Sequence, residues 1–209
     1  MNSQKKLERE FYNRDSLVVA KELLGKVLVH EVDRQKISAK IVETEAYMGI
    51  IDKAAHSYGG RRTQRVEVMY GGPGYSYVYF IYGMYYCFNI VTQEAGIPQA
   101  VLIRGVEPVD GIDLIAKNRF RKPYDQLTKA QKKNLTNGPG KLCSGLAIDK
   151  GFNGEDLCGS KIYVEEAKGG ESDKISIVSA KRVGIDYAEE AKDYLWRFYI
   201  EGNSHVSVK

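Results

Sequence analysis

The sequence lacks the features that mark membrane-spanning, secreted or disulfide-built proteins. No stretch reaches the roughly 18 apolar residues that a membrane-spanning helix needs. The first residues, MNSQKKLERE, lack the apolar core of a signal peptide. Only three cysteines occur, Cys87, Cys143 and Cys158, and they are widely spaced without a CxxC pair. We therefore expect ordinary thiols and a cytoplasmic protein.

Histidine is equally scarce. His30, His56 and His205 are scattered, and no HExxH motif or paired Cys/His cluster occurs, so we expect no metal site. Internal repeats and low-complexity linkers are also missing. The length of 209 residues suits one domain with a buried core, and 43% hydrophobic and 28% charged residues are ordinary for a globular protein. A net charge of +4 is compatible with a polyanionic partner but does not require one.

Tyrosine, by contrast, is abundant and concentrated. Seven of the fifteen tyrosines lie between Tyr70 and Tyr86, in the segment YGGPGYSYVYFIYGMYY. A phenol ring combines an apolar face for stacking with a polar tip that needs a partner or water, so this segment is expected to face a ligand. The pattern alternates over residues 75–81, reverses at Gly83 and returns over 85–92. It predicts a β-hairpin with Tyr82 and Met84 near its tip.

The rest of the chain alternates between strands and helices. Apolar spacing predicts a helix over 16–24, from a cap at Asp15 or Ser16 to Gly25. β-Branched residues predict paired strands over 26–32 and 37–43, which places Glu43 and Glu45 at a strand end. A further strand is expected over 99–106, helices over 112–119, 128–134 and 141–148, and short strands near Ile162, Ile175 and Arg197. The class is mixed α+β.

Glu45, Tyr47 and His56 precede the aromatic hairpin, and together with it they are the residue types expected in a ligand-binding pocket. A carboxylate can act as a general base on water, and aromatic rings with His56 could sandwich a flat ligand. From the residues alone, the commoner alternative is that Glu43 and Glu45 are solvated strand-end charges, because charged residues are mostly exposed. His56 and the tyrosines could likewise be structural.

Basic residues gather in two places. Arg61, Arg62 and Arg65 precede the hairpin, and several lysines and arginines lie within residues 117–133. Both groups could contact phosphates or form solvated faces. The segment NGPGK at 137–141 is a glycine-rich turn that opens a helix. Such a turn can attract anions, or it can simply be a tight turn with a proline near the helix start.

Several long motifs stand in an order that resembles the alkyladenine (methylpurine) DNA glycosylase family. They are IVETEAYMG at 41–49, AAHS at 54–57, GGR at 59–61, YVYFIYGMYYCFNI at 77–90, LIRGVEP at 102–108 and NGPGKLCSGLAI at 137–148. Weaker similarity continues through RVGID at 182–186 and WRFYIEGN at 196–203. The expected architecture is one domain over residues 13–209 after a flexible N-terminus of residues 1–12. It would have a curved, mostly antiparallel sheet, flanking helices and a protruding aromatic hairpin.

The resemblance implies hydrolysis of the bond between a damaged purine and deoxyribose in double-stranded DNA. That bond is buried in the duplex, so the nucleotide must be rotated out into a pocket. Tyr82 matches the family residue that enters the minor groove and fills the vacated space, with Met84 and Tyr85 in support. The residues that match those stacking on and contacting the extruded base are Tyr47, His56 and Tyr79.

The resemblance also assigns roles in the reaction. Glu45 matches the general base that activates water, and Arg104 matches a residue near that water and the nucleotide's phosphate. Asn89 would lie at the pocket floor and discourage the exocyclic amino group of guanine. The loop over residues 93–99 is about two residues longer than expected for the family. No cofactor is implied.

Lys141 is interpreted as a phosphate or structural contact rather than a Schiff-base former. A lysine that forms a Schiff base needs a lowered pKa, which requires burial or a cationic neighbour, and the sequence shows neither. We therefore expect a monofunctional enzyme that leaves an abasic site. It should act as a monomer and associate with the nucleoid when bound to DNA. Methylated adenine, methylated guanine, hypoxanthine and etheno adducts all fit the resemblance.

Two alternatives stay open from the sequence. A module that binds modified or distorted DNA without cleaving it would use the hairpin and the basic surface but not Glu45. A hydrolase of free nucleosides would use Glu45 and the aromatic pocket but not an exposed Tyr82. Duplex context separates the nucleoside hydrolase, which should ignore it, from a base-flipping glycosylase, which should require it.

Overall fold

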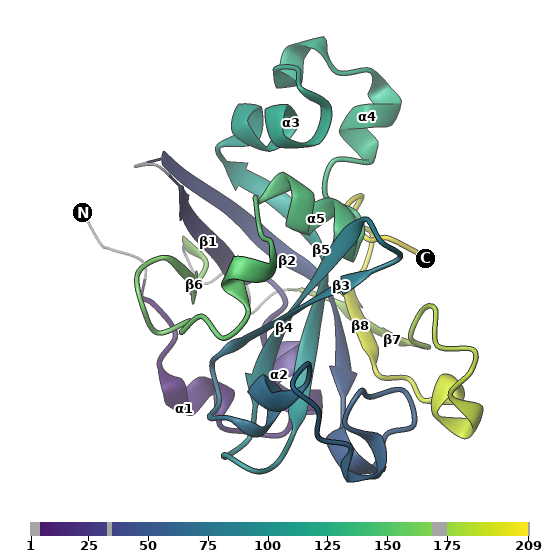
Figure 1. Ribbon diagram of the computed structural model, residues 1–209. Coiled ribbons are helices and arrows are strands. Elements are labelled where there is room, and N and C mark those ends of the chain that lie inside the picture. Colours follow the sequence, from purple (N-terminus) through teal and green to yellow (C-terminus); the bar gives the residue numbers. More distant parts are fainter. Residues whose placement is uncertain (1–4, 33–34, 169–174, 209) are drawn as a thin grey trace.

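The computed structural model describes residues 5–32, 35–168 and 175–208. Over these residues the chain forms one eight-stranded sheet with the order β3-β4-β5-β2-β1-β6, while β8 pairs with β2 and β7 (Figure 1). Neighbouring strands run antiparallel, so the predicted α+β class with a curved antiparallel sheet is confirmed. The strands are β1 (Val27–Val32), β2 (Gln35–Tyr47), β3 (Ser76–Ile81), β4 (Tyr85–Thr92), β5 (Gln99–Asp110), β6 (Ile162–Glu165), β7 (Ile177–Ala180) and β8 (Arg197–Ile200).

Short helices flank the sheet. In the middle of the fold α2 packs against β2 and α5 against β4, whereas α3 and α4 lie together at one end, beyond α5 (Figure 1). No helix in the described part of the chain is long and apolar enough to cross a membrane. The α-helices are α1 (Arg9–Tyr12), α2 (Ser16–Glu22), α3 (Ile112–Phe120), α4 (Lys129–Lys133) and α5 (Pro139–Gly145). The 3₁₀ turns are η1 (Gly49–Ile51), η2 (Tyr58–Gly60), η3 (Glu67–Tyr70), η4 (Tyr124–Gln126), η5 (Lys150–Phe152) and η7 (Glu189–Asp193).

The described part of the N-terminal segment packs against the domain. The Leu7 amide donates to the Val164 carbonyl at 2.9 Å, and both Leu7 and Tyr12 are buried in the main hydrophobic cluster. Flexibility of residues 1–12 and a single domain from residue 13 stay predictions.

Strand β2 runs further than its sequence pattern suggests. Its first half pairs with β1, and residues 43–45 pair with β8, which follows about 150 residues later. Glu43 and Glu45 are therefore inside a strand, and neither is exposed to solvent. The predicted strand-end position is wrong, and the alternative that the two glutamates are solvated charges is contradicted, because β8 pairs with this part of β2.

Besides a register shift after Ser38, the pairing of β2 with β5 contains two irregularities beside the glutamates. Ile41 pairs with Val106, Glu43 with Gly105 and Thr44 with Ile103, so Val42 on β2 and Arg104 on β5 each lack an opposite residue. An extra residue of this kind bends the strand and redirects neighbouring side chains. The second irregularity aims Arg104 toward the two glutamates of β2.

The hairpin of β3 and β4 turns where the sequence predicts. Tyr82 and Gly83 both have positive φ, 52° and 67°, and the Met84 amide donates to the Ile81 carbonyl at 3.1 Å. A two-residue turn with positive φ at both positions favours Asn-Gly or Gly-Gly. Tyrosine is costly at the first position, by about 1–2 kcal/mol, so Tyr82 serves something other than the turn.

Helix α5 starts and ends earlier than the predicted range of 141–148. It begins at Pro139, because the fixed φ of proline suits a first helical position and its missing amide costs nothing there. It ends at Gly145, and Ala147 has a φ of 55°, which a continuing helix does not allow.

Candidate active site

The strand register aligns one row of side chains across the sheet. Tyr77 on β3 pairs with Asn89 on β4, Asn89 with Leu102 on β5, and Leu102 with Glu45 on β2. Directly paired residues in an antiparallel sheet project to the same face. Four segments far apart in the chain therefore build one floor, with the carboxylate at one end of the row.

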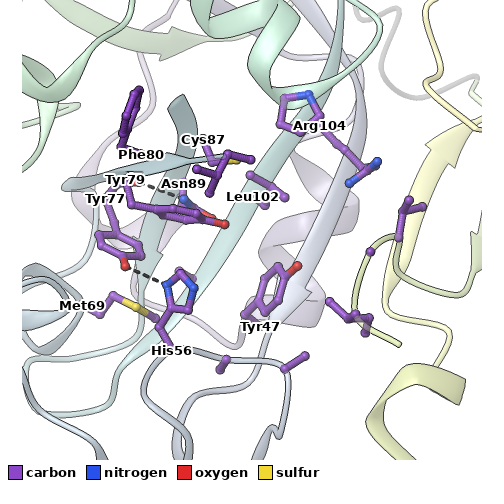
Figure 2. A pocket seen from close by; sticks show the side chains of 18 of the residues that line it. Tyr47, His56, Met69, Tyr77, Tyr79, Phe80, Cys87, Asn89, Leu102 and Arg104 are labelled. Atoms are coloured by element: carbon purple, nitrogen blue, oxygen red, sulfur yellow. Dashed lines mark hydrogen bonds between the residues drawn. The ribbon is translucent and has the colours of Figure 1, made fainter. Parts of the chain in front are cut away.

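A cavity of about 500 Å³ stands over this floor. That volume lies within the range of about 300–1,000 Å³ that is typical of small-molecule sites. Figure 2 shows rings from several segments around the open space. The lining includes Tyr47, His56, Tyr77, Tyr79, Tyr82, Cys87, Asn89, Leu102, Arg104 and Tyr187.

Aromatic side chains stand on opposite sides of the cavity. Figure 2 shows Tyr47 across the open space from Tyr79 and His56. The rings of His56 and Tyr79 meet edge to face, with centroids 4.7 Å apart. Because flat rings offer dispersion contact to a flat ligand, this arrangement suits a planar heterocycle.

Glu45 lies behind the wall of this space, where its carboxylate contacts the lining residues Tyr47, Arg104 and Val183. Its Oε1 accepts from the Val183 amide at 2.8 Å and lies 3.3 Å from an Arg104 nitrogen. Its Oε2 accepts from the Tyr47 hydroxyl at 2.9 Å. A carboxylate that is fully buried needs such partners, because burying an unpaired charge is very costly.

Tyr47 is fixed on both sides. Burial and the neighbouring Glu45 carboxylate raise the pKa of Tyr47 well above its usual value, so its hydroxyl stays protonated and donates. The Arg182 guanidinium lies 4.8 Å from the ring centroid and forms a buried ion pair with Asp52, at 2.5 Å. This wall of the cavity is therefore held from behind.

His56 is neutral at pH 7. Burial, followed by the charges of Arg65 and Arg61, lowers the pKa of His56 to about 4. Its Nδ1 is hydrogen-bonded to the Tyr77 hydroxyl at 2.8 Å, and burial raises the pKa of Tyr77 to about 12. The pair therefore presents an uncharged, polar edge to the cavity.

Arg104 and Tyr82 are two further predicted residues that line this cavity. Arg104 is 8% exposed, and its guanidinium reaches Glu45 from the strand irregularity of β5. Tyr82 lines the cavity mouth yet is 83% exposed at the hairpin tip. Phe80, Met84 and Tyr85 are exposed as well, so the hairpin tip carries a group of apolar side chains of the kind found at interaction sites.

Comparison with known proteins gives the family of the chain. A family model described as methylpurine-DNA glycosylase matches residues 10–204.

The chain belongs to the methylpurine-DNA glycosylase family.

Relatives cover nearly the whole chain. A protein of Desulfitobacterium hafniense (strain Y51), named "Putative 3-methyladenine DNA glycosylase", is 70% identical over 98% of this chain and 100% of its own length. A protein of Clostridium acetobutylicum with the same name is 62% identical to this chain, over 97% of this chain and 98% of its own length. In Clostridium novyi (strain NT) the identity is 57%, over 98% and 100%.

Met84 and Tyr85, which are expected to support Tyr82 in the DNA minor groove, lie outside the main cavity of this glycosylase family member. Met84 and Tyr85 line a second cavity of about 330 Å³ between the hairpin and α5. Tyr85 packs so closely on Gly140 that a Cβ there would lie 2.8 Å from its ring. Tyr85 thus braces the hairpin against α5, while Met84 is 68% exposed beside Tyr82.

Lys141 does not reach the main cavity. Its ammonium donates to the side-chain oxygens of Asn134 and Asn137, at 2.8 and 2.9 Å. Burial, followed by the charge of Arg119, lowers the pKa of Lys141. Among the described residues, no group of three or more His, Cys, Asp and Glu side chains is placed to hold a metal ion.

Sequence reasoning missed several contributors to the site of this methylpurine-DNA glycosylase family member. Tyr77 was assigned to the hairpin but not to the pocket, and the amide of Val183 lies in the motif RVGID, whose likeness is weak. Two further residues contact Arg104: Glu43, for which the residues alone favour a solvated charge, and Ser207, which lies outside every motif. The alternating pattern places Tyr77 on the same side of its strand as Tyr79, and it could have indicated Tyr77 as a pocket residue. The other residues reach the site through pairing between distant strands.

Proposed function

We propose that this chain is a DNA glycosylase that releases alkylated or deaminated purines from double-stranded DNA. The observation that supports this best is the buried Glu45 carboxylate, which contacts Tyr47, Arg104 and Val183 in the wall of an aromatic cavity. The lining of that cavity also includes the exposed Tyr82. Family membership supplies the class of reaction. The relatives' names point to 3-methyladenine as a substrate.

The proposed chemistry is hydrolysis with Glu45 as general base. A water oxygen attacks C1′ of the deoxyribose, and one of its protons passes to the Glu45 carboxylate. The bond between C1′ and the purine nitrogen breaks, and its electron pair leaves with the base. The developing positive charge on the sugar is stabilised by the carboxylate, as in glycoside hydrolysis. The products are a free purine and an abasic site.

The cavity is suited to select damaged purines. A purine alkylated at a ring nitrogen is cationic and gains about 0.5–2 kcal/mol against aromatic faces, here those of Tyr47 and Tyr79. Such a base also leaves without being protonated. Asn89, buried at the floor, donates to the Tyr77 carbonyl at 2.9 Å and would disfavour the exocyclic amino group of guanine.

Tyr82 is proposed to hold the DNA open. Rotating a nucleotide out of the duplex costs a few kcal/mol, and a side chain inserted in its place offsets part of that cost. The strained turn conformation keeps the ring of Tyr82 outside the hairpin and at the cavity mouth. Met84 would accompany Tyr82, and Tyr85 would hold the hairpin in place.

The enzyme is proposed to be monofunctional and monomeric. Cleavage of the strand through a Schiff base needs an amine nucleophile at the sugar. Among the described residues that line the cavity there is no lysine, and the ammonium of Lys141 is bound to two asparagine side chains.

Single-turnover base release tests the proposed function. Duplexes carrying 3-methyladenine or hypoxanthine would be incubated with wild type, Glu45→Gln and the exposed-site control Glu94→Gln, and alkali would reveal abasic sites. We expect release by wild type and control, and a loss of about 100-fold or more in Glu45→Gln with duplex binding retained.

Substrate form separates the alternatives in the same experiment. Equal release from the duplex and from the free nucleoside would show a nucleoside hydrolase. Binding of the damaged duplex without any release by wild type would show a binding module, and either result would overturn the proposed function.

A further inference from the structure

Glu43 is a second buried carboxylate that the proposed chemistry does not use. It is not exposed, and it lies two residues before Glu45 on the same strand. Its Oε1 accepts from an Arg197 nitrogen at 2.9 Å and from the Ser207 hydroxyl at 3.0 Å. Its Oε2 accepts from the Ser207 amide at 2.7 Å. Both carboxylate oxygens of Glu43 therefore have hydrogen-bond partners within the fold.

Arg104 is shared between the two carboxylates. Its Nε lies 3.3 Å from Glu43 Oε1 and donates to the Ser207 hydroxyl at 3.1 Å. Another guanidinium nitrogen lies 3.3 Å from Glu45 Oε1. The guanidinium is therefore held on one side by Glu43 and Ser207 and meets Glu45 on the other.

The C-terminal segment, residues 203–208, closes over this cluster. The Val208 carbonyl accepts from an Arg197 nitrogen at 2.8 Å. The His205 carbonyl lies so close to Gly105, next to Arg104, that a Cβ there would be 2.8 Å from its oxygen. Residues at the far end of the chain thus hold the side chains of β2, β5 and β8 in place.

We propose that Glu43 is a positioning residue, fastened by Ser207, which keeps Arg104 on the Oε1 side of Glu45 and away from Oε2. The inference rests on the proposed function of Glu45. Two carboxylates compete for one guanidinium, and attraction to Glu43 and Ser207 limits its approach to Glu45. Oε2 then stays available to a water, with the Tyr47 hydroxyl beside it.

Removing the charge of Glu43 changes how Arg104 is shared between Glu43 and Glu45. In Glu43→Gln the two arginines face one carboxylate instead of two, so Arg104 is no longer held away from Glu45. Base release should slow, and because a neighbouring negative charge is lost, the acid limb of its pH profile should move to lower pH. The charged and titratable groups that surround the pair Glu43 and Glu45 are Arg104, Arg197, Arg182, Tyr47, Tyr79, Tyr187 and Cys87.

The test is the pH dependence of single-turnover release from a 3-methyladenine duplex, measured between pH 5 and 9. Variants are Glu43→Gln, Glu43→Asp, Ser207→Ala and, as a matched control on the same segment, the exposed Ser204→Ala. We expect release by Glu43→Gln to fall about tenfold or more, with the acid limb lowered. Glu43→Asp keeps the charge and should keep the wild-type limb. Ser207→Ala should slow release about threefold or more, and Ser204→Ala should match wild type.

The outcomes are distinguishable. A purely structural role predicts variants that are less stable but release base with the wild-type rate and acid limb once folded, and that result overturns the inference. If Glu43→Gln does not fold, Ser207→Ala decides, since wild-type release by that variant also overturns it. Absence of release by wild type itself would instead overturn the proposed function, and this inference with it.

Discussion

At the scale of single residues, the site depends on donors that converge on one buried carboxylate. Glu45 meets the Val183 amide, the Tyr47 hydroxyl and the Arg104 guanidinium. These partners come from three separate parts of the chain. Hydrogen bonds to a charged group are worth about 1.5–3 kcal/mol each, more than bonds between neutral groups. Each partner should therefore affect the reaction measurably.

Tyr47→Phe tests the donor on Oε2. The variant keeps the aromatic wall but removes the hydroxyl that lies 2.9 Å from Glu45. We expect single-turnover release to fall about tenfold to 100-fold, with little change in duplex affinity. Tyr79→Phe is the matched control, because it removes a cavity hydroxyl on the opposite wall, and it should slow release less. Equal rates in wild type and Tyr47→Phe would contradict the assigned contact.

At the scale of secondary-structure elements, the hairpin is built with local strain at its tip. Tyr82 adopts a left-handed conformation at φ 52° in a position where asparagine or glycine is favoured. Strain of this kind persists at functional sites where the side chain is needed. Packing of Tyr85 on Gly140 holds the base of the same turn against α5.

Tyr82→Asn should separate stability from activity. Asparagine relieves the left-handed strain, so we expect the free energy of unfolding to rise by about 1 kcal/mol. Base release from duplex DNA should fall about tenfold or more, because the ring that would fill the vacated space is lost. Urea unfolding and single-turnover release measure the two effects. Tyr82→Phe keeps the ring and the strain and should resemble wild type; wild-type release by Tyr82→Asn would rule out the wedge.

At the scale of the whole molecule, the histidines couple stability to pH. Burial lowers the pKa of His30 and of His205, and it lowers that of His56 to about 4. An unfolded chain binds these protons near pH 6.5, whereas the folded chain does not. Stability is therefore fully present above pH 6.5 and is lost as the pH falls toward the folded values.

His56→Gln tests the largest of these shifts. Urea unfolding at pH 7 and pH 5 should show a smaller loss of stability in the variant than in wild type, by an amount on the order of 1 kcal/mol. Between pH 7 and 9 the two proteins should show the same pH dependence, since His56 is neutral throughout. A loss between pH 7 and 5 that is identical in both proteins would contradict the lowered pKa of His56.

Local sequence signals were sufficient for most elements of the fold. Alternation over 75–81 and the reversal at Gly83 predicted the hairpin, and the cap at Asp15, whose side chain accepts from the Leu17 amide, marked the start of α2. These features depend on residues only a few positions apart. The same locality misplaced α5, because Pro139 and Ala147, rather than the apolar pattern, set its ends.

The sequence by itself determined the family, through long motifs in a fixed order, and it determined which residue types were available for chemistry. Tertiary structure alone decided their surroundings. From its local sequence Glu43 resembles a solvated charge, but in the structure it is buried and pairs with Arg197, 154 residues away. The row from Tyr77 to Glu45 exists only through the register of four strands. Register depends on the pairing of distant segments, and no local pattern encodes which strand will cover another.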